Sequence, residues 1–285
     1  GRSGCVFHEV FGVDEGATLP RIEALEEAAA VAAGPPPWGD LAYAPSPHTL
    51  YTTHPAAVRR LLELSRQRGG LASLHLLEHG AERRALEAGE GPVLPWLERR
   101  ARLAAERAFW PRRPVLDYAA ELGVLGPDVL LVHLTVARAD ELARIAEARA
   151  PVVLCPRSNL TIELALPPLL QALAAGLEPA LGTDSLASNT SLDVLAEARA
   201  LHDRFPPVPA AQLLAMATWN GARALRRPDL GRVRRGARPG LFVVPGAPTG
   251  DPAAHVLTHC KAPRTWLVPR RPKASRPPAL TLVPS

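Results

Sequence analysis

The chain has 285 residues, 47% of them hydrophobic, which is enough to bury one large core. No run approaches the roughly eighteen consecutive apolar residues of a membrane span, and the three cysteines are too far apart for a disulfide framework or a thiolate zinc site. The first residues lack the charged-then-apolar order of a signal peptide, so we expect a cytoplasmic protein.

The net charge of +5 is concentrated near the end of the chain. Residues 226–285 hold twelve Arg or Lys against two acidic residues, a balance that nucleic-acid-binding proteins also show. The whole chain is nevertheless rich in Ala, Arg and Pro, and its only lysines are Lys261 and Lys273. We attribute the positive charge to this overall composition and expect no nucleic-acid partner.

Short apolar runs alternate with helical patterns along the chain. The pattern predicts six strands, and helices between them that include 56–67, 138–148 and 167–175; the strands are 5–12, 41–48, 71–78, 129–134, 151–159 and 179–185. Such alternation is typical of a parallel sheet with crossover helices. The expected class is α/β, with a (β/α)8 TIM-like barrel spanning residues 1–239.

Three further expectations concern the organisation of the chain. Six strands do not close an eight-stranded barrel, and the chain opens in a strand without Met, so we expect one or more βα units before Gly1. The long segment 87–122 predicts an inserted helix over 96–114, which acts either as a lid or as an amphipathic surface helix. Two helices, over 191–205 and 210–227, should complete the barrel, and residues 240–285 should form a small β appendage with a loose basic, Pro-rich tail.

Four side chains that suit metal or proton chemistry stand at the ends of predicted strands: His75, Glu78, His133 and Asp184. Parallel strands deliver such residues to one rim of a barrel. His75 and Asp184 are candidate ligands for Zn²⁺, which lowers the pKa of a bound water to roughly 7. Glu78 would contact the substrate and pass it a proton. His133 would hydrogen-bond the developing negative charge, and Asp184 would take the first proton from the water.

Other polar residues near these strands carry weaker signals. Arg157, Ser158 and Asn159 follow a predicted strand, so they either orient a substrate or cap the next helix. His8 and Glu9 alternate sides of a strand, so at most one faces the site, and we assign neither a role. The pair His255 and His259 lies in a Pro-rich region where a helix is doubtful, so we expect no metal site there.

Several motifs occur in an order that resembles the amidohydrolase superfamily. They are SPHTLYT (46–52), HLLE (75–78), VHL (132–134), VVLCPRSNL (152–160), ALGTDSLASNTSLD (180–193) and ATWNGARAL (217–225). The branch that they resemble holds S-adenosylhomocysteine, guanine and aminodeoxyfutalosine deaminases and chlorohydrolases. The resemblance implies a distorted barrel, one divalent metal ion, usually zinc, with Fe or Mn as alternatives, and hydrolytic release of an amino group from an aromatic ring.

The resemblance also implies roles for individual residues. His75 and Asp184 would be metal ligands, Glu78 and His133 catalytic, and His48 in contact with the substrate. Three departures stand out. Members of this branch carry a His-x-His pair that supplies two more ligands, and no such pair occurs in these residues. Residues 160–168 read LTIELALPP where glycines are usual. His79 stands where a small hydroxyl residue is common. One interpretation is that His79 is exposed to solvent and has no role.

The sequence therefore predicts a metal-dependent aminohydrolase with a small purine-like or related heteroaromatic substrate. The alternatives are a hydrolase that releases chloride or an amine from a triazine-like ring, and a non-catalytic barrel used for binding. A homo-oligomer is compatible with the sequence. With only His75 and Asp184 as protein ligands, fewer than the three that catalytic zinc sites typically use, we expect residues 1–285 alone to hold zinc poorly and to be inactive.

Overall fold

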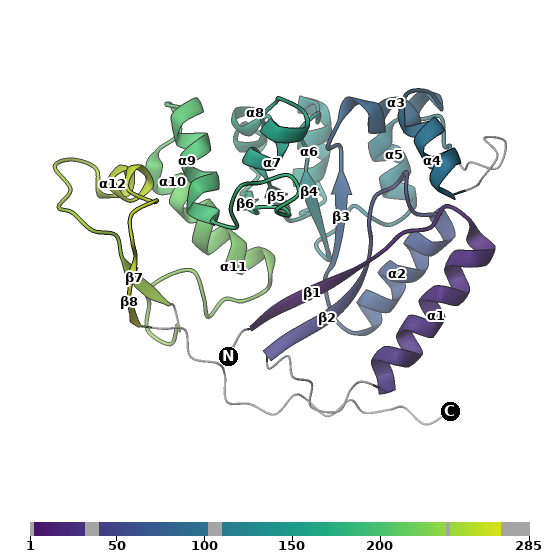
Figure 1. The fold of residues 1–285 in the computed structure, drawn as a ribbon, viewed down its shortest axis with the longest axis horizontal. Helices are drawn as coiled ribbons and strands as arrows, with labels where there is room; N and C mark the ends of the chain where they lie inside the picture. The colour runs from purple at the N-terminus through teal and green to yellow at the C-terminus, as the bar shows by residue number, and fades with distance from the viewer. Residues whose placement is uncertain (1–2, 32–39, 102–109, 238–239, 269–285) are drawn as a thin grey trace.

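The computed structural model describes residues 3–31, 40–101, 110–237 and 240–268. All six predicted strands are present, each over part or most of its predicted range (Figure 1). They are β1 (Ser3–Val10), β2 (Asp40–Pro47), β3 (Ala72–Leu76), β4 (Val129–His133), β5 (Val152–Leu154) and β6 (Ala180–Leu181). The parallel sheet that the alternation predicted is confirmed, with β1 paired to β2 and the order β3, β4, β5, β6 in the second group.

A short bridge joins the two groups of strands. Thr49, just beyond β2, pairs in parallel with His75 of β3, and the His75 amide donates to the His48 carbonyl at 2.9 Å. The strands therefore follow one another in space in chain order. Because sequential parallel strands share one direction, their carboxyl ends meet at one edge.

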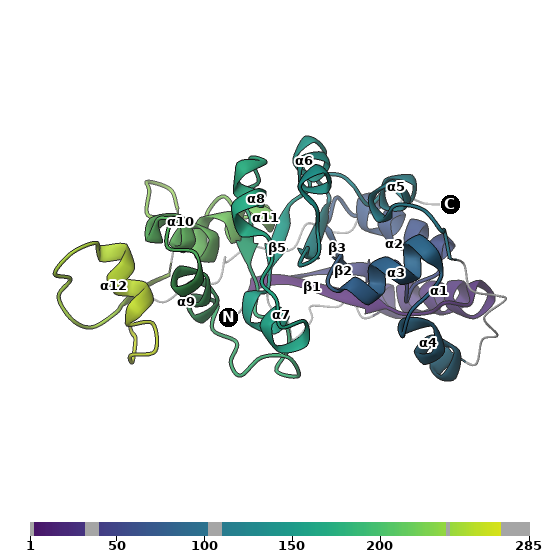
Figure 2. The same ribbon diagram turned by 90° about the horizontal axis from the view of Figure 1, so that it is seen from above.

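Helices connect the strands and cover them, and Figure 2 shows α5, α6 and α8 on one side of β3 to β5. They are α1 (Glu15–Val31), α2 (Pro55–Gln67), α3 (Gly80–Ala88), α4 (Val93–Ala101), α5 (Val115–Glu121), α6 (Ala139–Glu147), α7 (Pro156–Ile162), α8 (Leu169–Ala174), α9 (Val194–Arg204), α10 (Ala210–Ala215) and α11 (Gly221–Ala224). The helix predicted over 210–227 is one continuous run, in which a π-helical turn, Met216–Asn220, joins α10 to α11. None of the described helices combines the length and hydropathy that crossing a membrane requires.

Local sequence signals explain where α2 begins and which face it buries. His54 caps the helix, with its Nδ1 accepting from the Ala56 amide at 3.3 Å, and Pro55 occupies the first turn, where no amide donor is needed. Val58 and Leu62 recur at helical spacing and are buried against the strands. Strands β3 and β4 are almost entirely buried, as expected for a parallel sheet covered by helices, whereas β1 is only partly buried and its Val6 is exposed.

The segment predicted to hold one inserted helix differs from that expectation. Helix α4 ends at Ala101, residues 102–109 lie outside the described residues, and residues 110–114 are not helical. Val93 and Leu97 of α4 are buried in the main core beside α3. The described part of this segment is therefore anchored by apolar packing.

The region after Gly240 contains one helix, although the Pro-rich sequence around His255 and His259 made a helix doubtful. Helix α12 (Pro252–Thr258) lies between β7 (Leu241–Val243) and β8 (Thr265–Val268), which pair antiparallel. The doubt was wrong because Asp251 caps the helix through the Ala253 amide at 2.9 Å and Leu257 is completely buried in the main core. Strands β7 and β8 lie within the predicted β appendage, whose separation from the barrel stays a prediction, and the predicted tail, 269–285, lies outside the described residues.

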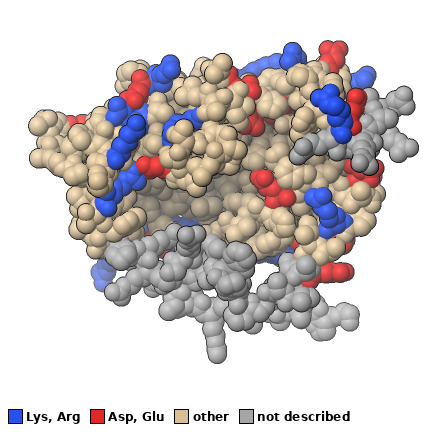
Figure 3. All heavy atoms as spheres, in the orientation of Figure 1, with Lys and Arg blue, Asp and Glu red and all other residues tan. Residues whose placement is uncertain are grey.

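The described surface shows no segregation of charge on the face drawn in Figure 3, where Lys and Arg side chains are interspersed with Asp and Glu. Ion pairs among the described residues include Arg59 with Glu121 and Arg199 with Asp203. Interspersed charge of both signs differs from the basic stripe of a nucleic-acid-binding surface.

Candidate active site

The carboxyl ends of three strands bring the predicted site residues together. His75 lies in β3, His133 ends β4, and Asp184 follows β6. The rings of His75 and His133 are 5.2 Å apart between centroids, and one ligand atom each of Glu78, His133 and Asp184 lie within 4.8 Å of one another. The four residues singled out in the sequence therefore line one continuous area at this edge.

The backbone at these strand ends has an unusual conformation. His133 has φ 81° and Asp184 has φ 54°, both in the left-handed region that non-glycine residues avoid. Leu77, one residue before Glu78, has φ 52°. Each such residue costs about 1–3 kcal/mol and persists only where the surrounding structure enforces it, as at many functional sites.

Burial controls the protonation of Glu78. The side chain is 16% exposed, and its Oε1 lies 3.5 Å from His133 Nε2. Burial, followed by the negative charges of Asp184 and Glu163, raises the pKa of Glu78 to about 7. A carboxyl group with this pKa exchanges a proton readily at neutral pH, which suits a general acid or base.

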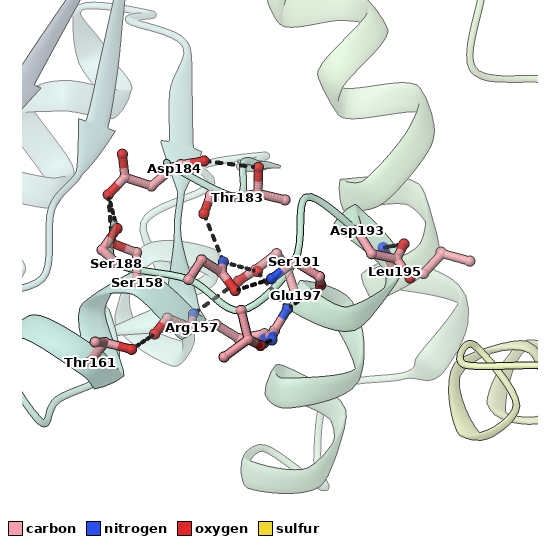
Figure 4. A network of polar contacts seen from close by, with 12 residues as sticks. Arg157, Ser158, Thr161, Thr183, Asp184, Ser188, Ser191, Asp193, Leu195 and Glu197 are labelled. Carbon is pink, nitrogen blue, oxygen red and sulfur yellow. Dashed lines mark hydrogen bonds and ion pairs between the residues drawn. The ribbon is translucent and has the colours of Figure 1, made fainter. Parts of the chain in front are cut away.

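Asp184 has the opposite behaviour although it is also partly buried. Burial alone would raise its pKa, but hydrogen bonds from Ser158 and Ser188 and the neighbouring His133 outweigh this effect, so the pKa of Asp184 lies below its ordinary value. Both serine hydroxyls donate to Asp184 Oδ2 at 2.6 Å (Figure 4). Asp184 is therefore a carboxylate at neutral pH.

The three residues expected to orient a substrate direct their hydrogen bonds toward protein groups. Ser158 and Asn159 are completely buried; Ser158 donates to Asp184, and the Asn159 amide lies 3.1 Å from His133 Nδ1. The Arg157 backbone amide donates to buried Glu197 at 2.9 Å, and its guanidinium reaches Ser191 and Thr190 (Figure 4). Ser158 and Asn159 therefore hydrogen-bond to the site residues Asp184 and His133. Their contacts with a substrate stay a prediction.

His79 has a structural role that the sequence did not reveal. It is partly buried and caps α3, with Nδ1 accepting from the Glu82 amide at 2.8 Å, while Nε2 lies 3.1 Å from the Tyr51 hydroxyl. The interpretation of an exposed His79 without a role is therefore wrong. The imidazole takes the place of a small hydroxyl residue because its Nδ1 is an equally good acceptor for the helix N-terminus.

Glu82 completes this support and holds the backbone of Glu78. Its carboxylate accepts from the Leu77 amide at 3.0 Å and from the Glu78 amide at 2.8 Å. Burial raises the pKa of Glu82 to about 8, although these backbone hydrogen bonds act in the opposite direction. Glu82 thus fixes the turn that aims Glu78 at the site.

The raised pKa of Glu82 predicts a pH-dependent contribution to stability. The folded pKa of about 8 exceeds the ordinary value of 4.5, so the folded state binds this proton more tightly and the contribution is lost as pH rises toward 8. Between the ordinary pKa of 4.5 and the folded pKa of about 8, we expect the free energy of unfolding of the metal-free wild-type protein to fall relative to that of Glu82→Gln. The expected fall is up to about 1.4 kcal/mol for each pH unit. Denaturant unfolding at several pH values measures the difference. The exposed Glu147→Gln is the matched control, and parallel pH profiles for wild type and Glu82→Gln would contradict the assignment.

His48 and Glu9 form a second group around His75. One ligand atom from each of the three residues lies within 4.8 Å of the others, with Glu9 Oε1 3.4 Å from His75 Nε2. His48 Nδ1 is 2.7 Å from the Thr52 hydroxyl, which leaves its Nε2 toward the site. Burial and the neighbouring imidazoles of His75 and His133 lower the pKa of His48 to about 3, so it is neutral.

Glu9 is the site residue that sequence reasoning set aside. Strand alternation required that only one of His8 and Glu9 face the site, and the structure places Glu9 there while His8 Nδ1 pairs with the Tyr43 hydroxyl at 3.0 Å. The register of β1 against β2, with Glu9 opposite Ser46, decides which side faces inward. Glu9 and His48 are therefore two further candidate donors beside His75, and the expected count of two protein ligands stays a prediction.

The donor chemistry of the site fits a divalent metal ion. Imidazole nitrogen and carboxylate oxygen are the ligands that Zn²⁺ takes in catalytic sites. Burial and His75 lower the pKa of His133 to about 4, so His133, like His48, is neutral at pH 7, and Asp184 supplies a negative charge. Among the described residues, no group of three mutually close donors contains both His75 and Asp184, so their joint ligation stays a prediction.

Comparison with known proteins agrees with this geometry. The sequence pattern of the amidohydrolase family matches residues 39–261, well over half of the chain. The chain belongs to the amidohydrolase family. The resemblance seen in the motifs is thereby confirmed.

Two curated relatives of this amidohydrolase are deaminases. Aminodeoxyfutalosine deaminase of Deinococcus radiodurans is 35% identical over 196 residues, which cover 66% of this chain and 46% of that protein. 5-Methylthioadenosine/S-adenosylhomocysteine deaminase of Moorella thermoacetica is 35% identical over 164 residues, 55% of this chain and 38% of that protein. The chain thus matches less than half the length of these relatives.

Solved structures show the likeness in fold. Aminofutalosine deaminase of Helicobacter pylori superposes with a TM-score of 0.77 and 24% identity, covering 90% of this chain and 64% of that one. Zinc-complexed atrazine chlorohydrolase of Arthrobacter aurescens TC1 gives a TM-score of 0.68 and 18% identity, covering 95% of this chain and 63% of that one. Together with the parallel strands, these matches establish a TIM-barrel-like α/β fold for the amidohydrolase chain.

Proposed function

We propose that this amidohydrolase chain carries the catalytic part of a hydrolase that deaminates a purine-like or related heteroaromatic amine. The observation that carries the proposal is the pair of carboxyl groups, Glu78 with a pKa of about 7 and Asp184 with a depressed pKa, both close to neutral His133. Two carboxyl groups with separated pKa values are suited to separate proton-transfer roles. The names of the deaminase relatives support the substrate class.

The proposed metal ion is zinc. We assign His75 and Asp184 as its ligands because the family resemblance implies these roles. When bound, a divalent ion supplies Lewis-acid activation and lowers the pKa of water. Asp184, already ionised, need not lose a proton before it binds a metal.

The residues divide the proton transfers of deamination between them. Asp184, a carboxylate at neutral pH, accepts a proton from the water that adds to the ring carbon bearing the amino group. Glu78 passes a proton to the ring nitrogen beside this carbon. Asp184 then gives its proton to the amino group, which leaves as ammonia, while Glu78 takes up the proton of the added hydroxyl group; its pKa of about 7 allows both steps. His133 faces the same space through Nε2 and stabilises the developing negative charge. We assign to His48 a contact with the substrate ring, as the family resemblance implies.

A screen for ammonia release tests the proposed function. The substrates are aminodeoxyfutalosine, 5-methylthioadenosine, S-adenosylhomocysteine and guanine, each assayed with added zinc and with a chelator. Because the chain matches only part of its relatives, the assay uses the longest protein that the gene encodes. We expect zinc-dependent ammonia release from at least one substrate. Chloride release from a chlorotriazine, without any ammonia release, would instead favour the chlorohydrolase alternative.

A further inference from the structure

The side chain of Asn159 has a single described hydrogen-bonding partner, His133. Asn159, in α7, is completely buried, and its Nδ2 lies 3.1 Å from Nδ1 of His133, which is itself only 2% exposed. The other amide atom, Asn159 Oδ1, is buried without a partner among the described residues. A buried acceptor without a partner is a cost that an apolar side chain of similar volume would avoid. The amide N–H is therefore what Asn159 supplies at this position.

The opposite edge of the His133 ring faces carboxyl groups. His133 Nε2 lies 3.5 Å from Glu78 Oε1, and Asp184 belongs to the same close group of donors. The Asp184 carboxylate accepts hydrogen bonds and cannot donate them, and the Glu78 carboxyl group accepts through its unprotonated oxygen, so this environment favours a proton on Nε2. A neutral imidazole carries only one N–H, and its other nitrogen must then be an acceptor. The donating Asn159 amide meets that acceptor at Nδ1.

We propose that Asn159 is a positioning residue that holds His133 as the Nε2–H tautomer. His133 then works in the site as a hydrogen-bond donor toward the atom on which negative charge develops, and not as a base. The structural part of this assignment concerns the metal-free chain itself. Its catalytic consequence rests on the proposed function, in which His133 stabilises that charge.

The tautomer is measured directly by NMR on protein labelled with ¹⁵N-histidine, at neutral pH and with a chelator present. Long-range ¹⁵N–¹H correlations distinguish protonated from unprotonated ring nitrogens, and the spectrum of His133→Gln identifies the His133 signals. We expect wild-type His133 to carry its proton on Nε2 alone. A proton on Nδ1 in the wild-type protein would overturn the proposal without any need for variants.

Two substitutions at Asn159 test the cause. Asn159→Asp presents only acceptors to Nδ1, so we expect His133 to carry a proton on Nδ1 in this variant. Asn159→Leu removes the amide donor, and we expect the population of the Nδ1–H tautomer to rise well above that of wild type. An unchanged Nε2–H tautomer in folded Asn159→Leu would show that Asn159 does not set it.

A matched control separates positioning from general stability. Asn220 is also a buried asparagine, but its Nδ2 donates to the Pro179 carbonyl at 2.9 Å instead of to a site residue. Asn220→Leu should lower stability without altering the tautomer of His133, and a shift as large as that of Asn159→Leu would count against a specific role. In the active protein, Asn159→Leu should lower kcat by more than about tenfold with little change in KM, as expected for loss of an interaction made in the transition state. Absence of ammonia release from every substrate would refute the proposed function and leave the tautomer result intact.

Discussion

Replacing Glu78 by Gln is expected to lower the rate of ammonia release by about 10²–10⁴-fold, the usual contribution of a general acid or base. The amide keeps the size of the side chain but has no proton to transfer at neutral pH. Zinc content should remain unchanged, because Glu78 is assigned to the substrate and not to the metal. Steady-state kinetics and metal analysis of the same preparation give the two quantities.

The control for this substitution is Glu147→Gln, which makes the same chemical change on the exposed face of α6. It should leave both ammonia release and zinc content at the wild-type level. Near-normal turnover by Glu78→Gln would remove Glu78 from the mechanism. Loss of zinc together with activity would instead identify Glu78 as a metal ligand. Its closeness to His133 and Asp184 is compatible with that role.

Replacing His75 by Ala is expected to weaken zinc binding by about 10²-fold or more, since losing a direct ligand should exceed the 10–100-fold typical of losing a residue that only hydrogen-bonds to a ligand. His75 is the ligand assigned from the sequence, and it also adjoins Glu9 and His48. Competition against a chromophoric chelator measures the affinity of residues 1–285 directly, without any requirement for activity. Unaltered zinc binding by His75→Ala would exclude His75 as a ligand.

The matched control is His8→Ala, because His8 directly precedes Glu9 in β1. His8 pairs with Tyr43 on the side of the strand away from the site, so its loss should leave zinc affinity unchanged. Glu9→Gln and Asp184→Asn in the same titration decide which carboxylate assists His75. If Asp184→Asn has no effect while Glu9→Gln weakens binding, the ligand assignment drawn from the family resemblance is wrong for this chain.

Much of the fold followed from local patterns in the sequence. Apolar runs bounded by Gly, Pro and polar residues located all six parallel strands. The inner strands β3 and β4 are buried and therefore need a continuous apolar stretch. The same runs placed His75, His133 and Asp184 at strand ends. Helix α12 was missed because its capping residue and one buried leucine gave a weak signal within a Pro-rich region.

The sequence by itself determined which chemical groups stand at the carboxyl ends of the strands, since that depends only on strand positions and parallel order. Only the tertiary structure decided which groups face one another. The register of β1 turned Glu9 inward and His8 outward, and the packing of α7 set Asn159 against His133. Burial likewise separated the pKa values of Glu78 and Asp184. These properties depend on contacts between residues far apart in the chain and on exclusion of water, which no local pattern specifies.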